Sequence, residues 1–349
     1  MDPDASVRQT DTDAAGARLS AVQKGYFIDP FIKNFVPRAH LQPPRPPLIN
    51  VGTFMRSTAI DDLVDQWLSK STEKRCQIVS LGSGSDTRFW RIATGPHQDR
   101  LGKYIEIDFP EVTTKKAMTV KKSRELATVL GEPTQVTLGH GGAALHSPRY
   151  HLIPADLRHP PDEILGKTLT VPSSPNETKS ILSPSLPTLL LFECVLVYMT
   201  PEASSGLVRW FVDYFATESA NLGEDAILGA IVYEMFGLND PFGRIMVSNL
   251  KARNVTLPGA EPYHSIESLP SRFLNNGFSA ARALTLHQIR QNYVPTLELE
   301  RIAQLEMLDE VEELNLVLEH YAITWGLFLS NPASSMVWSD WGLKQRNPE

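Results

Sequence analysis

The chain has 349 residues, of which 42% are hydrophobic, a composition that excludes an intrinsically disordered protein. Its formal net charge of -7 argues against binding nucleic acid through bulk positive charge. Two cysteines, Cys76 and Cys194, are too few for a disulfide framework or a cysteine-rich zinc site. Because the start is polar and acidic and no apolar run is long enough to span a bilayer, we expect a soluble, cytoplasmic protein.

Residues 1–55 are expected to form an extension with a lid-like segment. Residues 1–20 are polar and small, and residues 37–47 carry five prolines, which favour extended geometry. Between them the aromatic stretch 21–36 is rich enough in apolar side chains to dock on a body. The first clear helix covers residues 53–70, where apolar residues recur with helical spacing.

The rest of the chain alternates short apolar strands with helical segments, the pattern of a parallel sheet covered on both faces. Strands are expected at 77–81, 104–108, 151–156, 188–193, 226–234, 279–286 and 321–329. Helices are expected at 111–126, from Thr200 onward, at 241–252, near 266–275 and within 297–320. The sequence therefore predicts an α/β fold with a Rossmann-like sheet.

The main domain is expected to cover residues 56–330, followed by a C-terminal tail over 331–349. Two segments are expected to interrupt it. Residues 160–187 hold six prolines and many serines and threonines, and are predicted to form an exposed insertion. Residues 235–275 are predicted to form a second insertion on the substrate side.

The strongest local motif is an apolar strand, 77–81, that runs directly into Gly82-x-Gly84. In an open α/β sheet this turn lies at the edge where ligands bind, and glycine lets the backbone approach a ligand closely. A dinucleotide-binding turn needs a third glycine at the position of Thr87. A nicotinamide-dependent oxidoreductase is therefore disfavoured, and the turn alone leaves open a ligand site or a plain strand-to-helix connection.

Acids follow three further predicted strands. Asp108 ends the strand 104–108, where a carboxylate can accept both hydroxyls of an adenosine ribose or cap the next helix. Asp156 ends the next strand, and Glu193 ends an apolar one. Because burying Glu193 alone is costly, it needs a partner, such as an adenine amine, a sulfonium or an arginine. Together the strand ends predict a nucleoside pocket without a phosphate cradle.

Such a pocket in such a sheet points to S-adenosyl-L-methionine, and the chain resembles the leucine carboxyl methyltransferases. The similarity covers about Ala14 to Gly326 and is carried by the segments GYFIDPFIKNFV, INVGTFMRS, IVSLGSGSDTRFWR, IEIDFPEV, PADLR, LLLFECVLVYMTPE and FGRIMVSNL. That family methylates the C-terminal leucine carboxylate of the protein phosphatase 2A catalytic subunit, which regulates phosphatase assembly. The resemblance implies a class I methyltransferase domain over 56–330 with an N-terminal helical extension.

The resemblance also implies which residues contact the cofactor: Arg18, Arg56, Gly82, Asp108, Asp156, Leu157 and Glu193. A terminal carboxylate, with a pKa of about 3.3–3.7, is already ionised at neutral pH and needs neither a general base nor a metal. An arginine clamp on that carboxylate would stabilise the ground state more than the transition state. We therefore place Arg56 on the methionine carboxylate of the cofactor, and give Arg56 and Tyr198 positioning roles.

The acceptor's tail must reach the pocket through a channel, whose walls are expected from Tyr26–Phe35 and from 235–275. Trp90 or Tyr198 is expected to face the sulfonium or shape this channel, with ordinary core packing as the alternative. The expected partner is the phosphatase tail, with no nucleic acid or membrane, and the expected state is a monomer. The competing functions are a carboxyl methyltransferase for a modified tRNA base and a non-catalytic binding protein of the same fold.

Overall fold

A computed structural model describes residues 4–171 and 180–346, and these form a nine-stranded sheet with the order β3-β4-β5-β2-β1-β6-β7-β9-β8. Five neighbouring strands are parallel: β5 (Tyr150–Pro154), β2 (Leu101–Asp108), β1 (Cys76–Leu81), β6 (Thr188–Glu193) and β7 (Ile227–Met235). On one side, β9 (Tyr321–Leu329) runs antiparallel between β7 and β8 (Ala280–Thr285). The other edge is a hairpin of β3 (Thr137–Gly139) and β4 (Ala144–His146).

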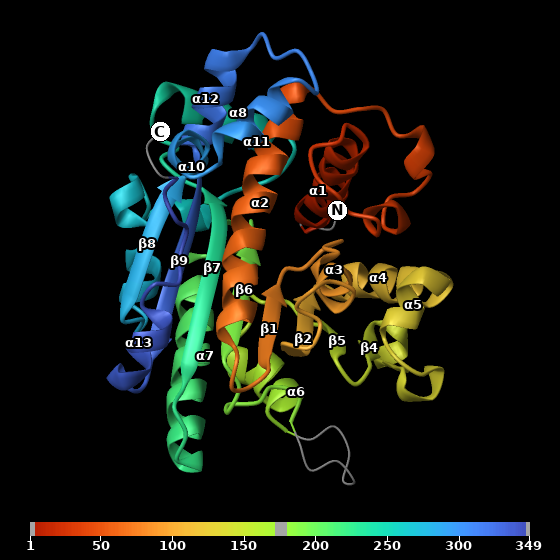
Figure 1. Ribbon diagram of the computed structural model, residues 1–349, viewed down its shortest axis with the longest axis vertical. Coiled ribbons are helices and arrows are strands. Elements are labelled where there is room, and N and C mark those ends of the chain that lie inside the picture. The colour runs from red at the N-terminus through yellow and green to blue at the C-terminus, as the bar shows by residue number, and fades with distance from the viewer. Residues whose placement is uncertain (1–3, 172–179, 347–349) are drawn as a thin grey trace.

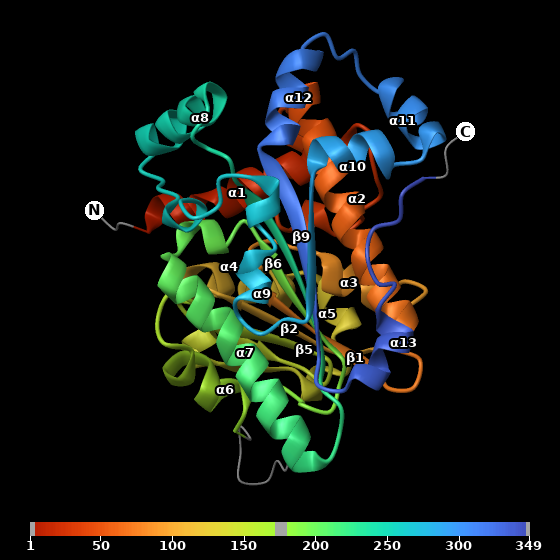
Figure 2. The same cartoon turned by 90° about the vertical axis from the view of Figure 1, so that its left-hand side faces the viewer.

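Helices cover both faces of the sheet (Figures 1 and 2). One face packs against α2 (Pro47–Lys70), α3 (Arg88–Ala93), α4 (Pro110–Lys122), α5 (Arg124–Val129), α10 (Leu286–Asn292) and α12 (Val311–Glu319). The other packs against α6 (Lys167–Leu169), α7 (Pro201–Leu222) and α9 (Ser271–Leu274). Along β6 the alternation is direct, since Leu189 and Leu191 face the first core and Leu190 and Phe192 face the second.

Helix α7 shows why the sequence places a helix after β6. The Thr200 side chain accepts a hydrogen bond from the Ala203 backbone N–H, Pro201 occupies the first turn, and Gly223 ends the helix in the left-handed region at φ 68°. Its buried stripe, which includes Leu207 and Phe211, fixes it on the sheet.

All seven predicted strands are present, within a few residues at their ends, so the predicted α/β sheet is confirmed. The hairpin β3–β4 was not predicted. The stretch 297–320 forms two helices rather than one, α11 (Thr296–Ala303) and α12, and the helix near 266–275 is a short turn followed by α9.

The prediction that 160–187 is exposed is wrong for the described ends of that segment, while residues 172–179 lie outside the described part. Leu165 and Leu169 on one side, and Ile181 and Leu182 on the other, are buried in the core beneath α7. These four apolar residues were missed because the prediction rested on the average composition of the segment, in which prolines, serines and threonines dominate.

The N-terminal residues form a helix, α1 (Ala5–Gln23), which packs against α2 and lies near the carboxyl ends of the parallel strands (Figure 1). The following aromatic stretch enters the core. The Tyr26 ring lies 6.1 Å from that of Phe54, and the Phe35 ring lies 5.4 Å from that of Trp90. Because α2 begins at Pro47, it crosses the expected division at residues 55 and 56.

Two other segments complete the described chain. Helix α8 (Pro241–Ala252) stands out from the body beside α1 (Figure 2). Near the C-terminus, Trp338, the last residue of α13 (Ser335–Trp338), and Trp341 beyond it pack on Trp67 of α2, with ring centroids 4.3 and 5.0 Å away. No helix in the described ranges is both long and apolar enough to cross a membrane.

Candidate functional site

A cavity of about 350 Å³ lies where the carboxyl ends of the parallel strands meet α1. Each predicted site residue lines it: Arg18, Arg56, Gly82, Asp108, Asp156, Leu157, Glu193 and Tyr198. The order of the sheet reverses at β1, and ligand sites in open α/β sheets form at that crevice. The four residues at strand ends, Gly82, Asp108, Asp156 and Glu193, therefore meet in one cavity.

The glycine turn after β1 forms the floor of the cavity. Gly82 and Gly84 adopt positive φ values of 66° and 48°, which L side chains rarely tolerate. A Cβ atom at Gly82 would lie 2.4 Å from Cγ2 of Val195, and one at Gly84 would lie 2.6 Å from Oδ1 of Asp11. Both glycines are thus required by backbone conformation and by close packing.

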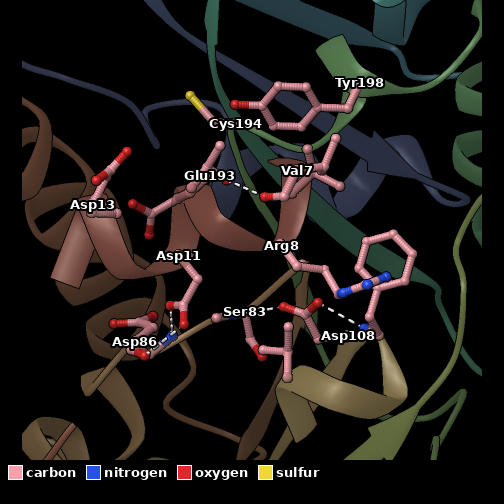
Figure 3. Close-up of a pocket in the computed structure, with 18 of the residues that line it drawn as sticks. Val7, Arg8, Asp11, Asp13, Ser83, Asp86, Asp108, Glu193, Cys194 and Tyr198 are labelled. Carbon is pink, nitrogen blue, oxygen red and sulfur yellow. Dashed lines mark hydrogen bonds between the residues drawn. The ribbon is translucent and has the colours of Figure 1, made fainter. Parts of the chain in front are cut away.

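The Asp108 carboxylate braces this turn from the end of β2. Its Oδ2 accepts a hydrogen bond of 2.7 Å from the Gly84 backbone N–H, and its Oδ1 accepts one of 2.7 Å from the Phe109 N–H (Figure 3). Burial raises the pKa of Asp108 to about 6, although both hydrogen bonds act in the opposite direction. The remaining lone pairs of a carboxylate stay able to accept two hydroxyl groups.

The partners of the Glu193 carboxylate in the structure are two arginines. Nη1 of Arg88 donates a 2.8 Å hydrogen bond to Oε1 of Glu193, and Nε of Arg56 lies 3.1 Å from Oε2. Burial is the largest single influence on the Arg56 pKa and lowers it, but Glu193, together with Tyr233 and Cys194, outweighs burial, so the Arg56 pKa is raised. The Arg56 guanidinium also lies over the Tyr233 ring, 5.1 Å from its centroid.

Among the described residues, three buried polar atoms of the cavity lining make no hydrogen bond. One is Nε of Arg56, which forms an ion pair with Glu193 at 3.1 Å. The other two are Nη2 of Arg18 and Oγ of Ser83. Arg18 is otherwise fixed, since its Nε donates to Asp29 at 2.6 Å and its Nη1 to Ser57 at 3.1 Å. A buried donor without a partner costs about 1–3 kcal/mol, so both groups favour a polar ligand in the cavity.

Acidic side chains of α1 and of Asp4, the residue just before it, hold the helix against the cavity rim. Asp11 accepts hydrogen bonds from the Ser85 backbone N–H at 2.6 Å and from its hydroxyl at 3.0 Å (Figure 3). Arg158 donates to Asp4 at 2.7 and 2.8 Å while it pairs with Asp156 at 2.6 Å. A third contact joins Asp13 to Arg253, just beyond α8.

The cavity lining also includes a set of aromatic and apolar side chains, which we call the apolar half and which Arg56 borders. The set includes Tyr198, Met199, Tyr233, Met235, Leu250 and Tyr321. The rings of Tyr233 and Tyr321 stack with centroids 5.4 Å apart. Burial raises the pKa of the Cys194 thiol, which also lines the cavity, to about 12, so this thiol is neutral at physiological pH.

Two channel predictions need correction. Within Tyr26–Phe35 only Ile32 lines the cavity, because the aromatic rings of this stretch pack into the core beneath α2. Trp90 is fully buried against Phe89 and Tyr150, so of the two aromatic candidates only Tyr198 reaches the cavity. Within 235–275, Met235, Leu250 and Arg253 do line it.

Sequence reasoning missed the contribution of α1, which supplies Val7, Arg8, Thr10, Asp11, Asp13, Ala14 and Ala15 to the lining. The Ser83 hydroxyl without a partner and the ion pairs of Arg88 were missed as well, although both residues lie in the segment IVSLGSGSDTRFWR. Among the residues described, no group of three or more His, Cys, Asp or Glu side chains is placed to hold a metal.

The strand order, with antiparallel β9 inserted beside the parallel strands, and the cavity over the turn after β1 define a class I methyltransferase fold. The sequence profile of the leucine carboxyl methyltransferases matches residues 6–212. A relative named leucine carboxyl methyltransferase 1 from Cryptococcus neoformans is 43% identical and covers 93% of both chains. Relatives with that name from Aspergillus fumigatus and Bos taurus are 37% and 38% identical. Their alignments span 97% and 92% of this chain, and 86% and 90% of the relatives' own lengths. The chain belongs to the leucine carboxyl methyltransferase family.

Proposed function

We propose that this methyltransferase transfers the methyl group of S-adenosyl-L-methionine to the C-terminal leucine carboxylate of the protein phosphatase 2A catalytic subunit. The observation that carries the proposal is the single cavity that gathers Asp108, Arg56 and Glu193 at the strand ends, with an apolar half beside them. Family membership supports the carboxyl group as the acceptor.

The residues present fit this cofactor. The two glycines give backbone access, Asp108 offers free lone pairs for ribose hydroxyls, and the orphaned Arg18 Nη2 and Ser83 Oγ need a polar partner. Arg18 and Arg56 would hold the cofactor's carboxylate, with Glu193, Asp156 and Leu157 completing the site. When bound, the cofactor supplies a methyl group made reactive by a positively charged sulfur.

The chain's own residues act by alignment and exclusion of water. No side chain has to remove a proton, because the acceptor carboxylate is ionised at neutral pH. Burial raises the pKa values of Tyr233 and Tyr198, so both stay neutral and shape the cavity without adding charge. An apolar environment favours a reaction in which opposite charges disappear as the ester forms.

The apolar half of the cavity suits a leucine side chain. Met199, Met235 and Leu250 provide aliphatic surface next to the stacked tyrosines. Burying a leucine side chain contributes about 1.5–3 kcal/mol, which favours it over a polar or small terminal residue. The net charge of -7 disfavours the alternative acceptor, a modified tRNA base.

Residues 4–46 would then act as an extension that closes the cavity, with α1 as its lid. We expect Asp11→Ala to speed cofactor dissociation about tenfold, because a charge-assisted hydrogen bond to the Ser85 N–H contributes about 1.5 kcal/mol. Stopped-flow displacement measures this rate. Thr12→Ala is the matched control, since Thr12 is exposed on the same helix. Equal rates in both variants would contradict the lid.

Cofactor affinity should fall as the pH drops through about 6. The pKa of unliganded Asp108 is about 6, and its charged form accepts hydroxyl hydrogen bonds better than its protonated form. Binding therefore lowers this pKa and releases a proton near pH 6, and affinity decreases up to about tenfold per pH unit below it. Calorimetry in two buffers of different ionisation enthalpy measures the released proton, and a pH-independent affinity would contradict the assignment.

The function is tested by locating the methyl group. The purified protein is incubated with labelled cofactor and the phosphatase catalytic subunit, and the product is digested and analysed by mass spectrometry. We expect the label on the terminal leucine, as an ester that mild base removes. Label on any other residue, or label that withstands base, would overturn the proposal.

A further inference from the structure

A second buried ion pair lies behind the apolar half of the cavity. Glu234 occurs on β7 between Tyr233 and Met235, which both line the cavity, so the alternation of the strand directs Glu234 to the opposite face. It is fully buried and pairs with Arg272 of α9, which is 2% exposed. Nε of Arg272 donates to Oε1 at 3.0 Å and Nη2 donates to Oε2 at 2.6 Å.

The Arg272 guanidinium also contacts two further segments, α7 and the loop that follows α8. Its Nη2 donates a 3.0 Å hydrogen bond to the Gly259 carbonyl, and its Nη1 donates one of 3.3 Å to the Ser204 hydroxyl in the first turn of α7. The Tyr263 ring covers the guanidinium with its centroid 4.2 Å away. One planar group therefore ties together β7, α7 and the loop that follows α8.

This loop packs directly on the turn that carries Tyr198. A Cβ atom at Gly259 would lie 2.0 Å from the Leu196 carbonyl oxygen and 2.8 Å from that of Met199, so the two backbones touch. Tyr198 and Met199 line the cavity. Any displacement of Gly259 therefore displaces the wall beside the apolar half.

We propose that the Arg272–Glu234 pair is a positioning device for the methyl acceptor: by fixing Gly259 against the turn at Leu196–Met199, it sets the shape of the apolar half of the cavity. The proposal rests on the proposed function for the identity of the acceptor. Neither residue lines the cavity, so the pair acts through Tyr198, Met199 and Met235. The glycine turn and Asp108 belong to other strand ends, so cofactor binding is independent of the pair.

Energetics support a geometric role. Taking two charges out of water costs several kcal/mol per ion, and well-packed apolar residues often replace a buried ion pair without loss of stability. A pair of apolar side chains, however, could not donate a hydrogen bond to the Gly259 carbonyl. It would also lack a planar guanidinium that bonds to three groups at the same time.

The test compares two variants. Arg272→Lys keeps the positive charge but loses the planar guanidinium, and the double variant Arg272→Met/Glu234→Met leaves no unpaired charge. The acceptor is the phosphatase catalytic subunit. We expect the KM for this acceptor to rise about tenfold in both variants, while kcat and the Kd for cofactor change less than about twofold. Arg209→Lys is the matched control, because this exposed arginine donates a hydrogen bond to the Asn275 carbonyl, beyond the end of α9.

Hydrogen exchange gives a readout that does not depend on the acceptor. Amides of residues 194–199 and 257–263 should exchange faster in both variants, while those of the glycine turn at 82–86 stay unchanged. If the wild-type protein fails to methylate the phosphatase, the proposed function fails and exchange still tests the pair. Unchanged KM in an active protein, unchanged exchange, or a parallel loss of cofactor affinity would each overturn the positioning role.

Discussion

Replacing Asp108 with alanine should raise the dissociation constant of S-adenosyl-L-methionine by about 100-fold, close to the 3 kcal/mol upper range for hydrogen bonds to a charged group. The loss has two sources. The cofactor loses its expected hydroxyl acceptor, and the Gly84 and Phe109 backbone N–H groups lose theirs, which loosens the turn that forms the cavity floor. Titration calorimetry measures the affinity.

Two further variants make this result interpretable. Asp108→Asn keeps the shape and one acceptor oxygen, so its affinity should fall between those of the wild-type protein and the alanine variant. Asp99→Ala removes an exposed carboxylate just before β2 and should bind the cofactor normally. Wild-type affinity in Asp108→Ala would show that the cofactor does not use the end of β2.

Arg88→Met is expected to lower the free energy of unfolding by about 3–5 kcal/mol, the usual cost of removing one partner from a buried ion pair. Arg88 is 2% exposed and touches three carboxylates: Asp86 at 2.6 Å, Glu193 at 2.8 Å and Asp61 at 3.1 Å. Burial disfavours its charge, but these carboxylates reverse the effect and raise the pKa of Arg88 well above its usual value. Urea denaturation measures the loss.

The control for this variant is Lys74→Met, which breaks an exposed ion pair with Glu224 and should cost less than about 1 kcal/mol. Arg88→Met should also weaken cofactor binding, because Glu193 would then have Arg56 as its one arginine partner and would compete with the cofactor for it. A stability loss as small as that of the control would contradict the account of the buried charges.

The sheet and half of the site were accessible from the sequence because both depend on local patterns. Short apolar strands alternate with helices, and parallel strands place their carboxyl ends at one edge. Gly82 directly follows a strand, and Asp108 and Glu193 each end one, so the topology rule alone predicts that they converge. The β3–β4 hairpin was missed because its strands have three residues each and little hydrophobic alternation.

The other half of the site depends on contacts between distant segments. Helix α1 has a polar sequence with a weak apolar stripe, and Asp11 finds Ser85 at a separation of 74 residues. Arg88 reaches Glu193 across 105 residues, and Arg272 reaches Glu234 across 38. Ion pairs of this kind leave no periodic signal, so the resemblance to a family, and not the residue pattern, pointed to Arg18 and Arg56.

The central claim is that the cavity methylates a terminal leucine carboxylate, and the initial rate of labelled methyl transfer tests it most directly. Four reactions are compared: wild-type protein or Asp108→Ala, each with the intact phosphatase catalytic subunit or with a form lacking the terminal leucine. The account predicts transfer by the wild-type protein to the intact subunit, a strongly reduced rate with Asp108→Ala at limiting cofactor, and none to the truncated form. Equal transfer to both forms of the phosphatase would contradict it.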